Sequence, residues 1–129
     1  MSTDTTASVS THILDTSMGR PAEGVAITLA ARSGSDAAWV TLGGSATDAD
    51  GRCKDLPALP EETTHVRLDF ETETYFAKKQ AEAQQDAPRV RDSGAFFPEV
   101  AITFAVKPGE HYHVPLLLNP FGYSVYRGS

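Results

Sequence analysis

In Thr64-His65-Val66-Arg67-Leu68-Asp69-Phe70, the apolar Val66, Leu68 and Phe70 alternate with the polar His65, Arg67 and Asp69, the clearest such pattern in the chain. Successive side chains of a β-strand point to opposite faces of a sheet, so this alternation predicts a strand with one buried and one hydrated face. Segments of similar character recur on both sides of it. We expect further strands over residues 8–15, 25–32, 39–42, 45–47, 100–106, 111–118 and 123–126.

Turn residues separate these segments, and two features predict how strands end or where they lie. Gly43-Gly44 is expected to end the strand over 39–42, because glycine weakens the interior of a strand. Pro115 lacks a backbone donor, which favours an edge position or a bulge for the strand over 111–118.

One segment has helical composition. Residues 71–85 are dominated by Glu, Ala, Lys and Gln and contain neither Gly nor Pro, which predicts a helix that Tyr75 and Phe76 hold against the sheets. The polar stretch 86–94 is expected to be a loop with Arg89 and Arg91 in solvent. Together these features predict an all-β domain over 8–129 after a flexible tail over 1–7. Its expected architecture is an antiparallel β-sandwich of about eight strands with one short helix.

Composition excludes several classes of protein. The chain has 129 residues, enough for one domain, and a formal net charge of -6. An acidic chain without clustered Lys and Arg is not typical of nucleic-acid binding. The sequence shows no apolar run long enough for a secretory signal or a membrane span, so we expect no membrane association and a cytoplasmic location. Cys53 is the only cysteine, so no intrachain disulfide forms, and we expect it to fill the core.

Three histidines are expected on one outer surface. His12 alternates with the apolar face of the strand over 8–15, and His111 and His113 share one face of the strand over 111–118. The same surface carries apolar side chains, so we expect another subunit to cover it or a ligand to bind there. The residues alone leave three interpretations open: solvated histidines, a zinc site formed by all three, or a general base.

Four motifs, in order along the chain, are similar to those of one family. They are Ser10-Thr11-His12-Ile13-Leu14-Asp15 with Gly19-Arg20-Pro21-Ala22, Thr47-Asp48-Ala49-Asp50-Gly51-Arg52, His111-Tyr112-His113-Val114-Pro115-Leu116-Leu117-Leu118, and Tyr126-Arg127-Gly128-Ser129. Through them the chain resembles the transthyretin-like 5-hydroxyisourate hydrolases from about Ser10 to Ser129. The last motif distinguishes such hydrolases from the hormone-carrying transthyretins.

The resemblance implies a transthyretin-like fold and hydrolysis of 5-hydroxyisourate, a urate-oxidation product, without metal or organic cofactor. It implies a homotetramer, a dimer of dimers, with active sites in a channel between dimers and His111 near the channel rim. In such a site a histidine activates water and an arginine stabilises developing negative charge. Which histidine is the base stays open. The implied catalytic residues are His12, Arg52, His113 and Ser129, and the implied substrate-binding residues are Tyr126, Arg127 and Gly128.

Two features depart from the family pattern. Asn119 stands where Ser is common before Pro120, and residues 81–94 form a longer link than usual, which predicts a surface insertion. Two other functions remain to be tested: a non-enzymatic carrier of small ligands with the same fold, and a zinc-binding structural module.

Overall fold

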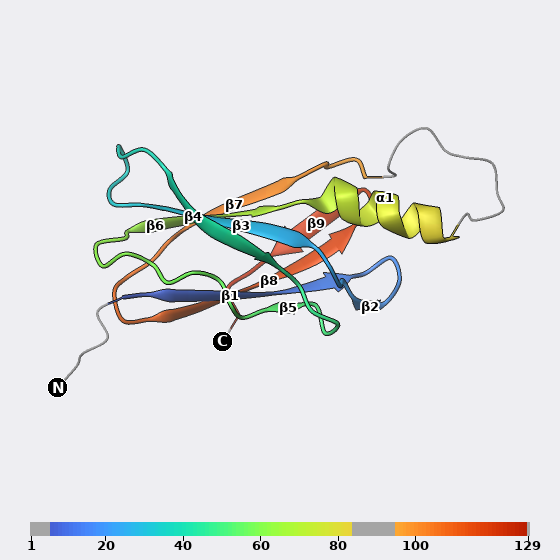
Figure 1. The fold of residues 1–129 in the computed structure, drawn as a ribbon, viewed down its shortest axis with the longest axis horizontal. Helices are drawn as coiled ribbons and strands as arrows, with labels where there is room; N and C mark the ends of the chain where they lie inside the picture. The colour runs from blue at the N-terminus through green and yellow to red at the C-terminus, as the bar shows by residue number, and fades with distance from the viewer. Residues whose placement is uncertain (1–5, 84–94, 129) are drawn as a thin grey trace.

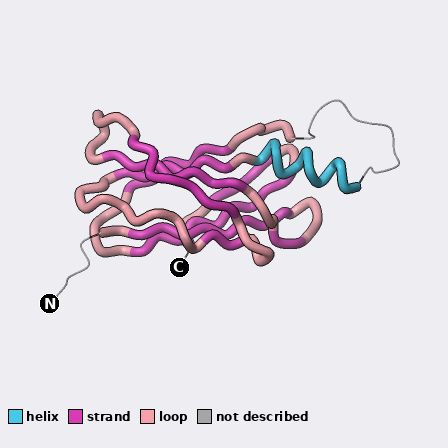
Figure 2. The backbone as a smooth tube through the Cα atoms, in the orientation of Figure 1, coloured by secondary structure: helices cyan, strands magenta, loops and turns pink. Residues whose placement is uncertain are grey.

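The computed structural model describes residues 6–83 and 95–128, which form two β-sheets packed face to face with a helix at one end (Figure 1). Figure 2 shows the same two layers of strands. Sheet A contains β1 (Ser8–Asp15), β2 (Arg20–Pro21), β5 (Arg52–Cys53), β8 (His111–Asn119) and β9 (Gly122–Val125). Sheet B contains β3 (Ala26–Arg32), β4 (Val40–Ala46), β6 (His65–Phe70) and β7 (Val100–Ala105), and α1 (Thr72–Ala83) follows β6. The predicted β-sandwich with one short helix is confirmed.

One strand pairing departs from the antiparallel expectation. Sheet A has the order β2-β1-β8-β9 with β5 also on β1, and sheet B has the order β4-β3-β6-β7. β1 and β8 run parallel, from Ser8 opposite His111 to Asp15 opposite Leu118. Every other strand pair in the described part of the chain is antiparallel. Side-chain alternation is the same in both directions, so it could not predict this pairing.

The core lies between the sheets and consists of the side chains that alternation predicted. Val66, Leu68 and Phe70 of β6 are fully buried. Fully burying an apolar side chain of this size stabilises the fold by about 1.5–3 kcal/mol. β1 and β8 also bury one face each, which leaves His12 and His113 half-buried on the outer face of sheet A.

β4 runs through Gly43-Gly44, so the prediction that these glycines end a strand is wrong, and the strand expected over 45–47 belongs to β4. A Cβ at Gly44 would lie 2.6 Å from the carbonyl oxygen of Ile27 on β3. Gly43 has a φ of 148° beside a register shift between Leu29 and Ala30. The two glycines therefore allow a bulge and a close strand approach.

β8 is an interior strand, so the edge position expected from Pro115 is also wrong. Pro115 pairs with His12 of β1, and its carbonyl accepts a hydrogen bond from the backbone N–H of Tyr126 at 3.4 Å. The N and C=O of one strand residue face the same neighbour, so the missing N–H of Pro115 also faces β9, which ends at Val125. The proline therefore removes one hydrogen bond from this pairing, which resumes where the N–H of Gly128 donates to the carbonyl of His113 at 2.7 Å.

The helix is held to the sandwich by the two expected aromatic residues. Tyr75 and Phe76 are buried, and the Tyr75 hydroxyl donates to Oδ2 of the buried Asp15 at 2.7 Å. α1 begins one residue later than predicted, at Thr72, whose hydroxyl donates to the carbonyl of Phe97. This contact fixes the start of α1 beside the loop that leads into β7.

Some predictions fall outside the described residues. Arg89 and Arg91 belong to this group, as do residues 84–94 of the expected insertion and residues 1–5 of the expected tail. Ala7, the last residue of that expected tail, is buried in the core. Within residues 6–83 and 95–128, no helix has the length and apolar character to cross a membrane.

Candidate active site

Three predicted site residues meet on the outer face of sheet A. His12 of β1 lies opposite Arg52 of β5, and His113 of β8 lies opposite Ser10, two residues before His12. Directly paired residues project to the same side of a sheet, so the two imidazoles and the guanidinium share one face. The predicted juxtaposition of His12, Arg52 and His113 is thus present within one chain.

The imidazole of His12 is oriented by the turn that carries Arg52. Its Nε2 lies 3.0 Å from the backbone carbonyl oxygen of Asp50. A carbonyl oxygen only accepts, so His12 carries a proton on Nε2. The Nδ1 atom of neutral His12 is then the acceptor.

The imidazole of His113 is held by a serine and lies near Arg52 and two other imidazoles. Its Nδ1 lies 2.9 Å from Oγ of Ser10. Burial lowers the pKa of His113 below its ordinary value of 6.5. The imidazole of His12, the guanidinium of Arg52 and the imidazole of His111 lower this pKa further. His113 is therefore neutral at pH 7, which a general base requires.

An open pocket of about 440 Å³ lies over this face. Arg52 of β5 and Lys54, the residue after β5, line it, whereas Cys53 between them is buried. These cations give a chain of net charge -6 a locally basic pocket, suited to oxygen-rich or negatively polarised groups. The lining residues are Ser10, Thr11, Arg52, Lys54, His111 and His113.

Sequence reasoning did not assign Ser10 or Lys54 to the site. Their period-two spacing from His12 and Arg52 was the available signal. Cys53, which separates Arg52 from Lys54, is buried in the core as predicted, and burial raises the pKa of its thiol.

The final described residues lie across the histidine face. The backbone N–H of Gly128 donates to the carbonyl of His113 at 2.7 Å. A Cβ on Gly128 would lie 2.9 Å from Cδ2 of His113 and 3.2 Å from two ring carbons of Pro115. Gly128 therefore packs directly against the proposed base, where larger residues do not fit. Ser129 lies outside the described residues.

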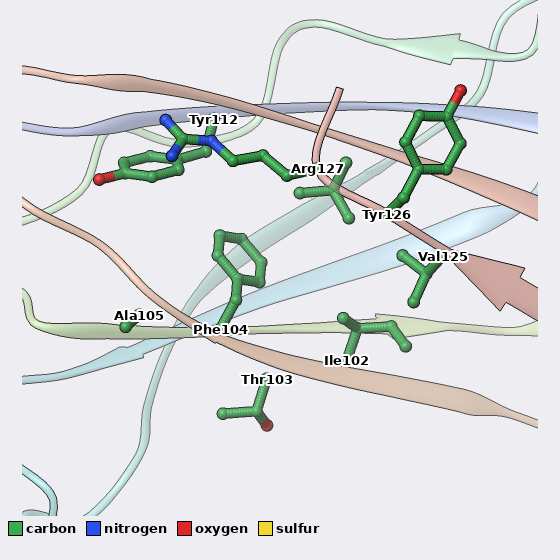
Figure 3. Close-up of a pocket in the computed structure, with 9 residues that line it drawn as sticks. Ile102, Thr103, Phe104, Ala105, Tyr112, Val125, Tyr126 and Arg127 are labelled. Carbon is green, nitrogen blue, oxygen red and sulfur yellow. The ribbon is translucent and has the colours of Figure 1, made fainter. Parts of the chain in front are cut away.

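Arg127 is placed away from the histidines. Its guanidinium lies 4.5 Å from the ring centroid of Tyr112 and 3.3 Å from a carboxylate oxygen of Glu110. Figure 3 shows the Arg127 side chain extended over Tyr112, whereas the Tyr126 ring points away from Phe104 and Ile102. A cleft of about 280 Å³, whose lining includes Phe104 and Ile102, lies beside Arg127. Tyr112 belongs to the inward face of β8, so Arg127 and His113 lie on opposite sides of sheet A.

Comparisons with known proteins show the family of the chain. The chain matches the HIUase/Transthyretin family over residues 9–128. A 5-hydroxyisourate hydrolase of Salmonella dublin is 41% identical over 123 residues, which cover 94% of this chain and 80% of that protein.

Two solved structures share the fold. The Klebsiella pneumoniae 5-hydroxyisourate hydrolase is 35% identical with a TM-score of 0.71, and the match covers 94% of this chain and 98% of that one. Sparus aurata transthyretin is 25% identical with a TM-score of 0.71, covering 93% of this chain and 95% of that one. By the extent of these matches, the chain belongs to the HIUase/transthyretin family.

Proposed function

We propose that this protein hydrolyses 5-hydroxyisourate in urate degradation. The observation that carries the proposal is the meeting of His12, Arg52 and His113 on one face, where burial first and the nearby Arg52 and imidazoles second lower the pKa of His113. The hydrolase names of relatives that match nearly the whole chain support it.

The proposed chemistry uses His113 as the general base. Its Nε2 takes a proton from a water molecule, and the resulting hydroxide attacks a ring carbonyl carbon of the substrate. The C–N bond of that amide then breaks, the hydrogen that remains on the added hydroxyl passes to the nitrogen, and the carbon becomes part of a carboxylate. The guanidinium of Arg52 holds substrate oxygens and stabilises the negative charge on the tetrahedral intermediate. His12, whose Nδ1 is an acceptor, holds the attacking water.

The final residues of the chain contribute to the proposed site to different degrees. Gly128 lets the backbone approach the ring of His113, and Ser129 is proposed to orient water or substrate beside it. Tyr126 is exposed and is proposed to contact substrate from the same tail. Arg127 is the weakest member of the set, because its guanidinium already contacts Tyr112 and Glu110 on the other side of sheet A.

We further propose that the histidine face lies in a channel of a homotetramer, a dimer of dimers. Leu14 and Leu117 are only half-buried on that face, beside His12 and His113, and a second subunit would cover them. Light scattering coupled to size-exclusion chromatography tests the assembly. A monomer at enzymatic concentration would contradict it.

The activity is tested by following the absorbance of freshly made 5-hydroxyisourate against its spontaneous decay. His113→Ala and Arg52→Ala should each reduce kcat by about 100-fold, the usual effect of losing a general base or an oxyanion donor. His65→Ala is the matched control, because His65 is a half-buried histidine on sheet B. Wild-type protein that fails to exceed the spontaneous rate would refute the proposed function.

Sparus aurata transthyretin has the same TM-score as the bacterial hydrolase, so a carrier is the second candidate function. Saturable binding of an aromatic ligand such as thyroxine, without hydrolysis of 5-hydroxyisourate, would favour it. Within residues 6–83 and 95–128, no group of three or more His, Cys, Asp or Glu side chains is placed to hold a metal ion, so no observation favours the zinc-binding module.

A further inference from the structure

A continuous hydrogen-bonded chain links His113 to the protein surface. Oγ of Ser10 lies 2.9 Å from Nδ1 of His113 and 2.9 Å from Nε2 of His111. Nδ1 of His111 lies 2.6 Å from Oγ of Ser8, and both of these residues are exposed. The parallel register builds this chain, because Ser8 lies opposite His111 and Ser10 lies opposite His113.

When His113 acts as the base, all three hydrogen bonds can donate in the same direction, from His113 toward Ser8. If Nε2 of His113 is free to accept a proton, its Nδ1–H donates to Oγ of Ser10. The Ser10 hydroxyl then donates to Nε2 of His111, and Nδ1–H of His111 donates to Oγ of Ser8. The Ser10 hydroxyl accepts once and donates once, and the Ser8 hydroxyl accepts from His111, so each of the three contacts has one donor and one acceptor.

We infer that Ser10 and His111 are positioning residues that fix the tautomer of His113 and conduct its surplus proton to the surface at Ser8. The inference deepens the proposed function and rests on it. When Nε2 of His113 takes the water proton, its Nδ1 proton moves to Ser10 and the Ser10 proton moves to His111. The Nδ1 proton of His111 moves to Ser8, and the Ser8 proton leaves to solvent, so the count balances.

A hydroxyl partner suits this base better than a carboxylate would. A carboxylate beside Nδ1 would raise the pKa of the imidazole, whereas Ser10 orients the ring without adding charge. The groups that act on the charge of His113 are His12 of β1, Arg52 of β5 and His111 of β8. The lowered pKa of His113 disfavours a second proton on its ring, and the hydrogen bonds to Ser10, His111 and Ser8 give that proton a route to the surface.

Ser10→Ala tests the orienting role because it removes both hydrogen bonds at once. We expect kcat to fall about 5- to 10-fold with KM unchanged, the effect of losing one orienting hydrogen bond. Ser10→Thr keeps a hydroxyl on a residue suited to a strand and should restore kcat. Ser45→Ala is the matched control, since Ser45 is a strand serine of sheet B whose hydroxyl bonds Asp55. Equal losses in Ser10→Ala and Ser10→Thr would overturn the inference.

The tautomer is read directly from the ¹⁵N chemical shifts of the His113 ring. Wild type should carry its proton on Nδ1, and Ser10→Ala should shift the ring toward the Nε2–H form. This measurement needs no turnover, so it separates a failed relay from a failed enzymatic function. A wild-type Nε2–H tautomer, or a tautomer and kcat that Ser10→Ala leaves unchanged, would overturn the inference.

His111→Phe tests the exit route. It should lose kcat in dilute buffer and regain it as imidazole buffer is raised, because a mobile base then replaces the missing link. A kcat equal to that of wild type in dilute buffer would remove His111 and Ser8 from the inference.

Discussion

Gly128→Ala isolates the contact between the tail and the proposed base. The added Cβ would lie 2.9 Å from Cδ2 of His113, about 0.5 Å inside the 3.4 Å at which ordinary contact begins. Pro115, the other neighbour at 3.2 Å, is buried and rigid, so the imidazole or the tail must move. A ring displaced by this amount loses the 2.9 Å hydrogen bond to Ser10.

The expected size of the effect follows from that displacement. A misplacement of about 1 Å costs on the order of 100-fold in rate, so half of it predicts a loss of about 10-fold in kcat for Gly128→Ala. Overpacking costs about 1–3 kcal/mol, and replacing glycine returns about 0.4–1 kcal/mol through the unfolded state. The free energy of unfolding should therefore fall by only about 1 kcal/mol, and activity should fall much more than stability.

Gly122→Ala is the control for this prediction. Gly122 lies in β9, and a Cβ there would come no closer than 4.0 Å to Asn119, which is ordinary contact. Both variants are assayed by 5-hydroxyisourate decay and by urea unfolding. A Gly128→Ala enzyme with wild-type kcat, or a Gly122→Ala enzyme with the same loss, would refute the argument that Gly128 protects the position of His113.

Three further predictions concern a buried hydrogen bond, a titration and a thiol. Tyr75→Phe removes the hydroxyl that donates to the buried carboxylate of Asp15 and should lower the free energy of unfolding by about 1.5–3 kcal/mol in urea; an unchanged midpoint would contradict this. Because burial first, and nearby cations second, lower the pKa of His113, the acidic limb of kcat/KM should lie below pH 6.5. NMR titration of Arg52→Gln should show a higher pKa for His113, and a lower one would reverse the assigned electrostatics. Cys53 should resist disulfide reagents in the folded protein and react fully in urea, because burial raises the pKa of its thiol; rapid labelling of the native state would show that the core opens there.

Alternation predicted the faces of the strands but not how the strands meet. Val66, Leu68 and Phe70 were identifiable as core because burial follows period two. β2 and β5 were not identified, because two-residue strands carry no periodicity. The pairing of β5 with β1 places Arg52 beside His12. Because β5 was not identified from the sequence, the geometry that brings these two residues together could not be predicted.

The predictions from Gly43-Gly44 and from Pro115 were wrong for a common reason. Gly44 ends no strand because its missing side chain lets β3 approach closely. Pro115 occupies an interior strand because only one hydrogen bond to the segment after β9 is lost, and the pairing continues at His113 and Gly128. Both outcomes depend on the neighbouring strand, which local propensity does not describe. The contacts of Ser10 depend on neighbours in the same way, since the register of β1 on β8 brings it to both histidines.

The parallel junction of β1 with β8 also sets when the catalytic apparatus is assembled. Ser10 and His113 are 103 positions apart, so a nascent chain leaving the ribosome holds its first histidine strand long before the second exists. Closing so long a loop costs entropy that no contact offsets until β8 docks, which makes this step late and slow. In refolding experiments, enzymatic activity should therefore return after the strands of sheet B have paired.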